Sequence, residues 1–144
     1  MRAMFFLMGF FFLVQVQGQK RVKKAFIGPR TEFVQIDAQN CYTIELSTAT
    51  TNEVNVAASI EGEYAKDLLV SIEEEGSTLR ISADFQPNFT NPNDKLSAHK
   101  VISIALQITV PYYKNVSIFG TKSEVQVEGN YKNLNIKLSE GRCV

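Results

Sequence analysis

Apolar and polar residues alternate along most of this chain, and the pattern is clearest in residues 101–110. The aliphatic side chains of this stretch fall at every second position: Ile102, Ile104, Leu106, Ile108 and Val110. Successive side chains of a strand point to opposite faces, whereas a helix would scatter these positions around its circumference. The pattern therefore predicts a strand that ends at Pro111, because proline cannot donate a hydrogen bond to a sheet.

Shorter segments with the same period lie before and after this strand. Two of them flank Gly76, which predicts a β-hairpin. The other expected strands are residues 33–37, 42–47, 53–57, 116–119, 124–127 and 134–138. Closely spaced strands with turn residues between them predict an all-β fold, β-solenoid-like or a stacked sandwich of short antiparallel and parallel strands.

A weak internal repeat is consistent with stacked β layers. Residues 53–56 (Glu-Val-Asn-Val) resemble residues 124–127 (Glu-Val-Gln-Val), and residues 61–64 resemble residues 128–131. Each layer of such a fold would bury its face against the next. Chance similarity between β-rich segments is the alternative.

The N-terminal residues 1–18 are predicted to be a secretory signal peptide. Arg2 supplies a positive charge, residues 4–14 are apolar, and the chain offers a cleavage site after Gly18. An uncleaved membrane anchor is the alternative, but this apolar run is shorter than the ~20 residues that span a bilayer. We therefore expect a signal peptide at 1–18, a polar lead-in segment at 19–32 and a single β-rich domain at 33–144.

Charge and cysteine content narrow the classes of function. The chain has 15 basic and 15 acidic residues, so its zero net charge gives no electrostatic reason to bind nucleic acid or an acidic membrane surface. Export would permit a disulfide between Cys41 and Cys143. Two cysteines do not make a disulfide framework, however, so two separate thiols are the favoured interpretation.

No cluster of residues predicts catalysis, a metal site or a cofactor. The chain has one histidine, His99, which excludes a site with several histidine ligands. Ser97 and Asp94 lie near it, but a catalytic triad is assembled by geometry beside an oxyanion hole, which three neighbouring loop residues do not ensure. The three glutamates at 73–75 are best interpreted as a solvated turn. We expect no enzyme, no cofactor and no metal.

Four aromatic residues form the candidate binding surface. Phe85, Phe89, Tyr112 and Tyr113 lie in or beside predicted loops, where exposed aromatic side chains can bind sugars or peptides. The alternative is that they cap the ends of the β core. Two of them belong to residues 84–100, a segment longer than a usual connection and so either functional or disordered.

The order of these elements resembles a bacterial family known as the auto-transporter adhesins with a head-GIN domain. The likeness covers about residues 33–138, and it is carried by segments 42–46 (Tyr-Thr-Ile-Glu-Leu), 52–56 (Asn-Glu-Val-Asn-Val), 69–72, 77–82, 104–111 and 116–120. The resemblance implies an exported, solenoid-like fold at the cell envelope or surface, with no catalytic residues to carry over. Members of that family continue through further β repeats, so this chain is expected to be shorter than its relatives.

Together these observations favour a non-enzymatic exported protein of the envelope or cell surface that acts as an adhesion or binding scaffold. The expected location is the periplasm, the cell surface or the medium, and the expected ligand is a glycan or a protein. One alternative is a fragment of a secreted carbohydrate-active solenoid enzyme, with Glu45, Glu53 and Glu124 on one sheet face. Another is a structural subunit that needs a partner, because an uncovered last strand invites edge pairing or oligomerisation.

Overall fold

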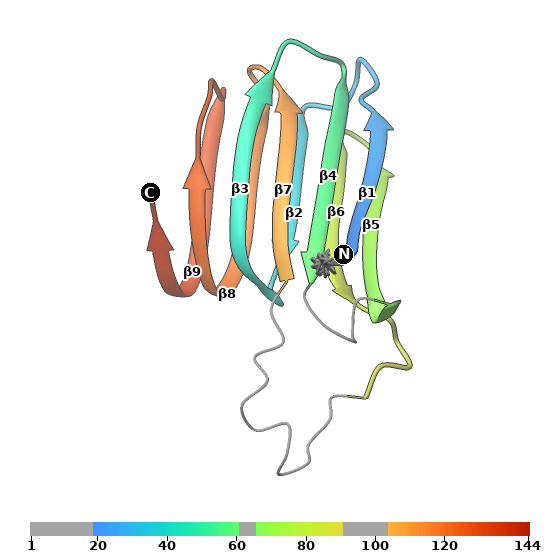
Figure 1. Cartoon of the computed structure of the whole chain (residues 1–144). Helices are drawn as coiled ribbons and strands as arrows, with labels where there is room; N and C mark the ends of the chain where they lie inside the picture. Colours follow the sequence, from blue (N-terminus) through green and yellow to red (C-terminus); the bar gives the residue numbers. More distant parts are fainter. Residues whose placement is uncertain (1–18, 61–65, 91–103) are drawn as a thin grey trace, which may run out of the picture.

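The computed structural model describes residues 19–60, 66–90 and 104–144, and the predicted signal peptide at 1–18 lies outside these residues. The described chain forms one sheet of nine strands (Figure 1). The strands are β1 (Gln19–Phe26), β2 (Phe33–Ala38), β3 (Cys41–Ala49), β4 (Glu53–Ile60), β5 (Leu68–Glu75), β6 (Thr78–Phe85), β7 (Ile104–Pro111), β8 (Asn115–Val127) and β9 (Asn133–Cys143). Within the described ranges, no helix has the length and apolar character to cross a membrane.

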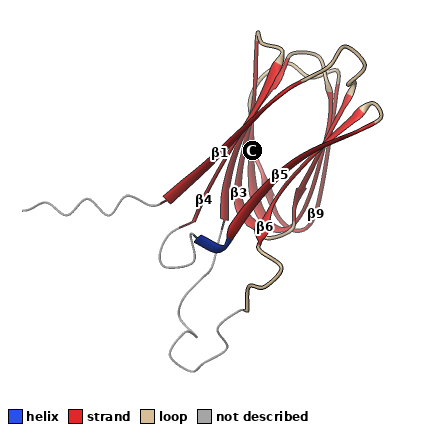
Figure 2. Ribbon diagram, turned by 90° about the vertical axis from the view of Figure 1, so that its right-hand side faces the viewer, coloured by secondary structure: helices blue, strands red, loops and turns tan. Residues whose placement is uncertain are grey.

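The sheet folds over on itself into two layers. The front layer of Figure 1 holds β1, β4, β7 and β3, and the back layer holds β5, β6 and β2, while β8 and β9 run through both. The strand order begins at β1 and ends at β5, and these two strands lie near each other, so the sheet is nearly closed like a barrel (Figure 2). The prediction of an all-β, solenoid-like stack that mixes parallel and antiparallel strands is confirmed.

The core lies between the layers and follows the predicted alternation. On β7, Ile104, Leu106, Ile108 and Val110 are buried and the residues between them are not, which confirms this part of the predicted strand. Residues 101–103 lie outside the described part. The facing layer supplies alternate residues in the same way, chiefly Val34, Ile36, Ile81 and Ile118.

The predicted hairpin around Gly76 is also confirmed. Strands β5 and β6 pair antiparallel from Leu68–Phe85 to Glu75–Thr78, which leaves a two-residue loop. Gly76 has φ of 62° at the first position of that loop. Glycine is favoured there because it adopts positive φ without a steric penalty.

Strand β8 differs from its prediction as two short strands separated at Gly120. It is one strand, whose residues 115–120 pair with β2 in the back layer and whose residues 124–127 pair with β3 in the front layer. Between these halves the strand bends around the core. A Cβ on Gly120 would lie 2.8 Å from Ser123 Oγ and 2.9 Å from Leu138 Cδ2, so a side chain there would have to displace these two side chains.

Strand β9 repeats β8 one step further along the stack. The two pair parallel from Asn115–Asn133 to Val125–Cys143, a constant offset of 18 residues. The repeat is visible in the sequence as Tyr-Lys-Asn-Val-Ser-Ile at 113–118 and Tyr-Lys-Asn-Leu-Asn-Ile at 131–136. The weaker repeat expected between residues 53–56 and 124–127 is not structural, because β4 runs antiparallel to β7 and hence to β8.

The first described segment differs from the expected polar lead-in at 19–32. Gln19–Phe26 pairs antiparallel with β4 along its whole length and extends the front layer. Its four basic residues conceal a period-two pattern, which is why the sequence suggested a solvated tail. Charged residues are common on edge strands because they discourage pairing with other chains.

The two cysteines are separate free thiols, as the sequence analysis predicts. Cys41 begins β3 and is buried, whereas Cys143 ends β9 and is exposed, and both thiols are free. Strand β8 lies between β3 and β9 in the front layer, which keeps the two residues apart.

Candidate binding site

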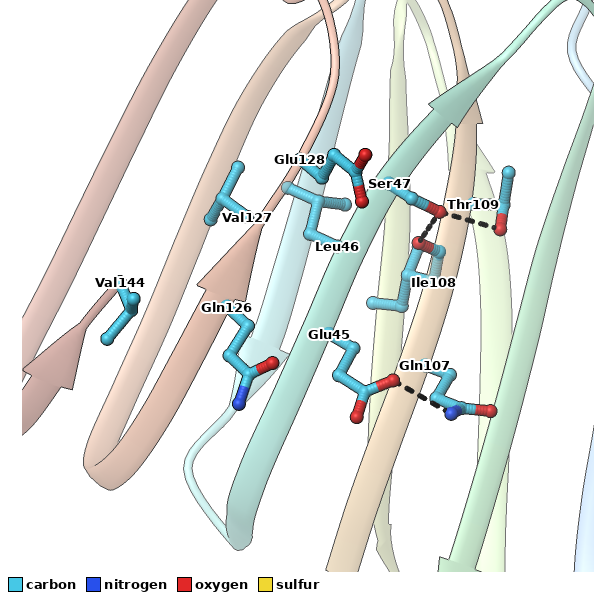
Figure 3. Close-up of a pocket in the computed structure, with 10 residues that line it drawn as sticks. All are labelled: Glu45, Leu46, Ser47, Gln107, Ile108, Thr109, Gln126, Val127, Glu128 and Val144. Carbon is cyan, nitrogen blue, oxygen red and sulfur yellow. Dashed lines mark hydrogen bonds between the residues drawn. The ribbon is translucent and has the colours of Figure 1, made fainter.

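A hollow lies on the outer surface of the front layer. Its volume is about 500 Å³, and it spans β7, β3 and the second half of β8 (Figure 3). Ten residues line it: Glu45, Leu46, Ser47, Gln107, Ile108, Thr109, Gln126, Val127, Glu128 and Val144. We call this hollow the front groove.

Strand register brings the polar residues of the front groove together. Ile44 and Leu46 point into the core, so Glu45 and Ser47 point outward. Because β3 pairs parallel with both neighbours, Glu45 stands beside Gln107 of β7 on one side and Gln126 of β8 on the other. Strand β3 and the distant pair β7 and β8 thereby contribute one row, in which a carboxylate lies between two amides.

Hydrogen bonds fix part of this row. Gln107 Nε2 donates to Glu45 Oε2 at 2.8 Å, and one step along the strands the Ser47 and Thr109 hydroxyls lie 3.1 Å apart (Figure 3). The first bond orients the Glu45 carboxylate toward β7. The Gln126 amide lies on the opposite side of Glu45 from Gln107 in the view of Figure 3.

The turn after β8 closes one end of the front groove. Glu128 N donates to Leu46 O at 2.9 Å, and the Tyr131 hydroxyl donates to Glu128 O at 2.8 Å. Burial of the hydroxyl, with the nearby Glu128 carboxylate, raises the pKa of Tyr131 to about 12. The hydroxyl therefore remains protonated at physiological pH and keeps its role as a donor that holds the turn against β3.

The front groove offers hydrogen-bond donors and acceptors rather than reactive groups. Carboxylates accept only, amides both donate and accept, and hydroxyls do both, which suits a ligand with many hydroxyl groups. Across the described ranges, no group of three or more His, Cys, Asp and Glu side chains is placed to hold a metal ion. His99 lies outside those ranges.

A smaller hollow of about 200 Å³ lies on the outer surface of the back layer. It is lined by Gln35, Asp37, Ser71, Glu73, Arg80, Ile81 and Ser82 of β2, β5 and β6. Arg80 also forms an exposed ion pair with Glu75, with its Nε 3.5 Å from the carboxylate. Exposed ion pairs of this kind contribute little to stability. At about 200 Å³, the hollow is smaller than typical small-molecule sites, so the front groove is the better candidate for a binding site.

The four predicted aromatic residues form two separate pairs. Phe85 and Phe89 stack with ring centroids 4.3 Å apart at the end of β6, and Tyr112 and Tyr113 lie 6.0 Å apart after β7. The phenylalanines lie at the end of the fold where β3 begins, because Asp84 accepts a hydrogen bond from Asn40. The tyrosines lie where β3 ends, since Tyr112 N donates to Ala49 O.

These pairs differ in exposure. Phe85 is half-buried and packs against the core, in line with a capping role, whereas Tyr113 is 71% exposed and has φ of 61°. The aromatic side chains therefore do not form a single surface, and neither pair lines the front groove.

The three glutamates of the enzyme alternative share the outer face of the front layer but do not converge. Glu45 and Glu124 lie on the neighbouring strands β3 and β8, whereas Glu53 lies on β4, beyond β7. Glu124 is further engaged by Arg142, whose Nη2 lies 3.4 Å from its carboxylate.

Sequence reasoning overlooked Gln107, Gln126 and Glu128. Gln107 lies between Leu106 and Ile108, and Gln126 lies between Val125 and Val127, so the alternation shows that both face outward, whereas Glu128 is exposed just after the end of β8. Which outward residues stand side by side depends on strand register, which the sequence alone does not supply. The 18-residue repeat would have placed β9 beside β8 but would not have placed β7 beside β3.

Comparisons with known proteins show the fold and no family. No protein-family model matches the chain, and no curated protein matches it either. The structure is similar to that of a "putative cell adhesion protein" from Clostridium sporogenes, with a TM-score of 0.56 and 12% identity over 85% of this chain and 57% of that one. It is also similar to a "putative adhesin" from Parabacteroides merdae, with a TM-score of 0.50 and 6% identity over 84% of this chain and 44% of that one.

The chain thus spans about half the length of these solved structures. At such low identity the likeness concerns the path of the backbone and not the side chains of the front groove. The head-GIN family and the auto-transporter role remain predictions from the sequence. This chain therefore shares its all-β fold with solved bacterial proteins that are named for adhesion.

Proposed function

We propose that this chain is a non-enzymatic exported protein of the cell envelope or surface that binds a hydroxyl-rich ligand, such as a glycan, in the front groove. The observation that carries the proposal is the outward row of Gln107, Glu45 and Gln126 across three strands. Planar amides and carboxylates side by side form paired hydrogen bonds with neighbouring hydroxyls of a sugar ring. The volume of about 500 Å³ lies in the range of small-molecule sites.

The rigid support of the row favours binding over turnover. It stands on strands whose inner residues are buried in the core or packed against it, so its backbone is held in place without a ligand. The one hydrogen-bonded carboxylate of the row, Glu45, is engaged by Gln107. The names of the two similar structures, which refer to adhesion, agree with a binding role.

Titration of the purified protein against a glycan panel tests the groove. Gln126→Ala removes an amide without touching the core, and we expect it to weaken binding at least about tenfold, as loss of a hydrogen bond in a desolvated site does. Gln35→Ala is the matched control, because Gln35 also faces outward but in the back layer. Equal affinity in both variants would place the ligand elsewhere, and release of free sugar would favour the enzyme alternative.

Location is tested separately. Protease added to intact cells should digest the protein if it is on the surface, and osmotic release should recover it if it is periplasmic. Recovery in the cytoplasmic fraction alone would contradict the exported location while leaving the groove experiment unaffected.

A further inference from the structure

Among the described strands, β9 is the last in the stack. It pairs with β8 on one side, and no other described strand lies along its second side. Within the described residues, its N–H and C=O groups on that side therefore have no strand partner. Such an edge is a template for another strand unless charge or shape prevents pairing.

The interior of the fold is open at this end as well. On β8, the inward residues Val116 and Ile118 are fully buried. Their partners on β9, Leu134 and Ile136, face the same interior but are covered on one side only, and Leu134 is 38% exposed. Both the hydrogen-bonding edge and the apolar interior therefore stop at the same strand.

We propose that a second copy of this chain covers this edge, with the two β9 strands antiparallel around a twofold axis. Strand β9 bends from the back layer to the front layer in the same way as β8. A twofold axis through the bend sets the back half of one β9 against the front half of the other and joins the two interiors. Isologous contacts of this kind are the commonest in soluble oligomers.

The inward residues restrict the register of this pairing. Inward side chains must meet inward side chains, because a shift by one residue would turn apolar groups to solvent. One register sets Leu134 opposite Cys143 of the second copy and Ile136 opposite Gly141. The same contacts occur twice around the axis.

Charges on the outward side favour this register over its neighbour. It places Lys137 opposite Glu140 of the second copy, again twice. A register shifted by two residues would instead oppose Lys137 with Arg142, and directly opposed like charges are destabilising. The edge is therefore complementary to itself in one antiparallel register.

These side chains are available for the contact. Lys137 lies over the Phe119 ring with its ammonium 5.8 Å from the centroid. Glu140 reaches Lys122 at 3.3 Å, but both side chains of that pair are more than two-thirds exposed. Exposed ion pairs are worth little, so Glu140 can turn to a new partner at a small cost.

Sedimentation of the purified protein over a range of concentrations tests the proposal. We expect a dimer, and we expect Lys137→Glu or Glu140→Lys alone to raise its dissociation constant at least about tenfold by opposing like charges. The double variant Lys137→Glu with Glu140→Lys restores opposite charges across the axis and should restore the dimer. Arg30→Glu, an equal change at an exposed position outside the strands, should leave it unchanged.

Covalent trapping tests the register. Leu134→Cys places a thiol opposite Cys143 of the second copy, and oxidised glutathione should then link two chains. Leu69→Cys, an exposed position on β5, is the control that should not cross-link in this way.

A monomer at about 100 µM, where even a weak contact populates a dimer, would overturn the proposal. So would growth beyond a dimer, or failure of the double variant to rescue. Because the front groove plays no part in these assays, their outcome is independent of the proposed ligand.

Discussion

At the scale of single residues, the alternation of the sequence predicts which side chains face the core but not what surrounds them. Cys41 is an example, because its position at the start of a strand gave no indication of its chemistry. In the structure its thiol is buried under the bend of β8, where Ser123 Oγ donates to Cys41 O at 2.7 Å. Burial, with the carboxylates of Asp37 and Asp84, raises the pKa of Cys41 to about 12.

Because of this raised pKa, the free energy of unfolding should fall as the pH rises into the alkaline range. The native state keeps the Cys41 proton at pH values where the unfolded chain has lost it, so the contribution is complete below about pH 9 and declines as pH rises toward 12. The full loss is about 4 kcal/mol, since each pKa unit is worth about 1.4 kcal/mol. Urea unfolding from pH 8 to 10.5 should show a steeper loss of stability for the natural chain than for Cys41→Ala. Equal slopes would contradict the assignment.

Gly141 is a second residue whose role follows from position. Its φ is 142°, and a Cβ there would collide with the backbone of Ser123 on β8. We expect Gly141→Ala to destabilise the protein by about 2 kcal/mol or more, because both backbone strain and the collision oppose it. Gly76→Ala is the matched control, with positive φ but nothing within 4 Å, and should cost about 1 kcal/mol. Denaturant titration of both variants measures the difference, and equal losses would show that the bend tolerates a side chain.

At the scale of elements, strands with uninterrupted alternation or a glycine turn could be predicted, and strands hidden by charge or bends could not. Strand β7 and the β5–β6 hairpin belong to the first group. Strand β1 belongs to the second because lysines mask its period, and β8 because Gly120 resembles a terminator although it only marks a bend. The candidate aromatic residues were identified as ends of elements, but their separation by the length of β3 follows only from the topology.

The long connection from β6 to β7 joins strands that lie beside β2 and β3, whose own connection is much shorter. Strands β2 and β3 pair parallel with β6 and β7 and are joined by Gln39 and Asn40 alone. The fold therefore needs no long segment at this place. Replacing residues 91–100 by about six Gly and Ser residues should change the free energy of unfolding by less than about 1 kcal/mol, because closure entropy varies slowly with loop length.

The corner between β2 and β3 provides the contrast. Thr121 donates to Gln39 O at 2.7 Å and Asn40 donates to Asp84 at 2.7 Å, so inserting the same linker between Gln39 and Asn40 should destabilise the protein more. Thermal unfolding of the two variants makes the comparison. A larger loss from the β6–β7 replacement would assign a structural role to that connection.

At the scale of the whole molecule, the described strands form a stack whose interior is fully buried at its centre, while no described strand covers the second side of β9. The class of fold could be predicted because period-two patterning extends over nearly the whole chain. The arrangement of its layers could not, since it depends on pairings such as β3 with β7, more than 60 residues apart. The front groove is formed by those pairings, so it could not be predicted from the sequence either.

Substitutions at equivalent positions of β8 and β9 should show that the interior is less tightly packed at β9. Ile118 and Ile136 are paired 18 residues apart and face the same interior, but only Ile118 is fully buried. At concentrations that keep the protein monomeric, Ile118→Ala should cost about 3 kcal/mol and Ile136→Ala about 1 kcal/mol. Urea unfolding measures both, and equal losses would show that the interior is as tightly packed at β9 as at the centre.

The passage of β8 and β9 from one layer to the other also has a mechanical consequence. Two layers held by side-chain packing alone can be peeled apart, whereas here the backbone itself crosses between them at the bends of both strands. Tension applied to the front surface is thereby carried into the back surface through covalent bonds. A protein that must hold a ligand against a pulling force gains from such a load path, since separation of its layers requires the chain to unravel.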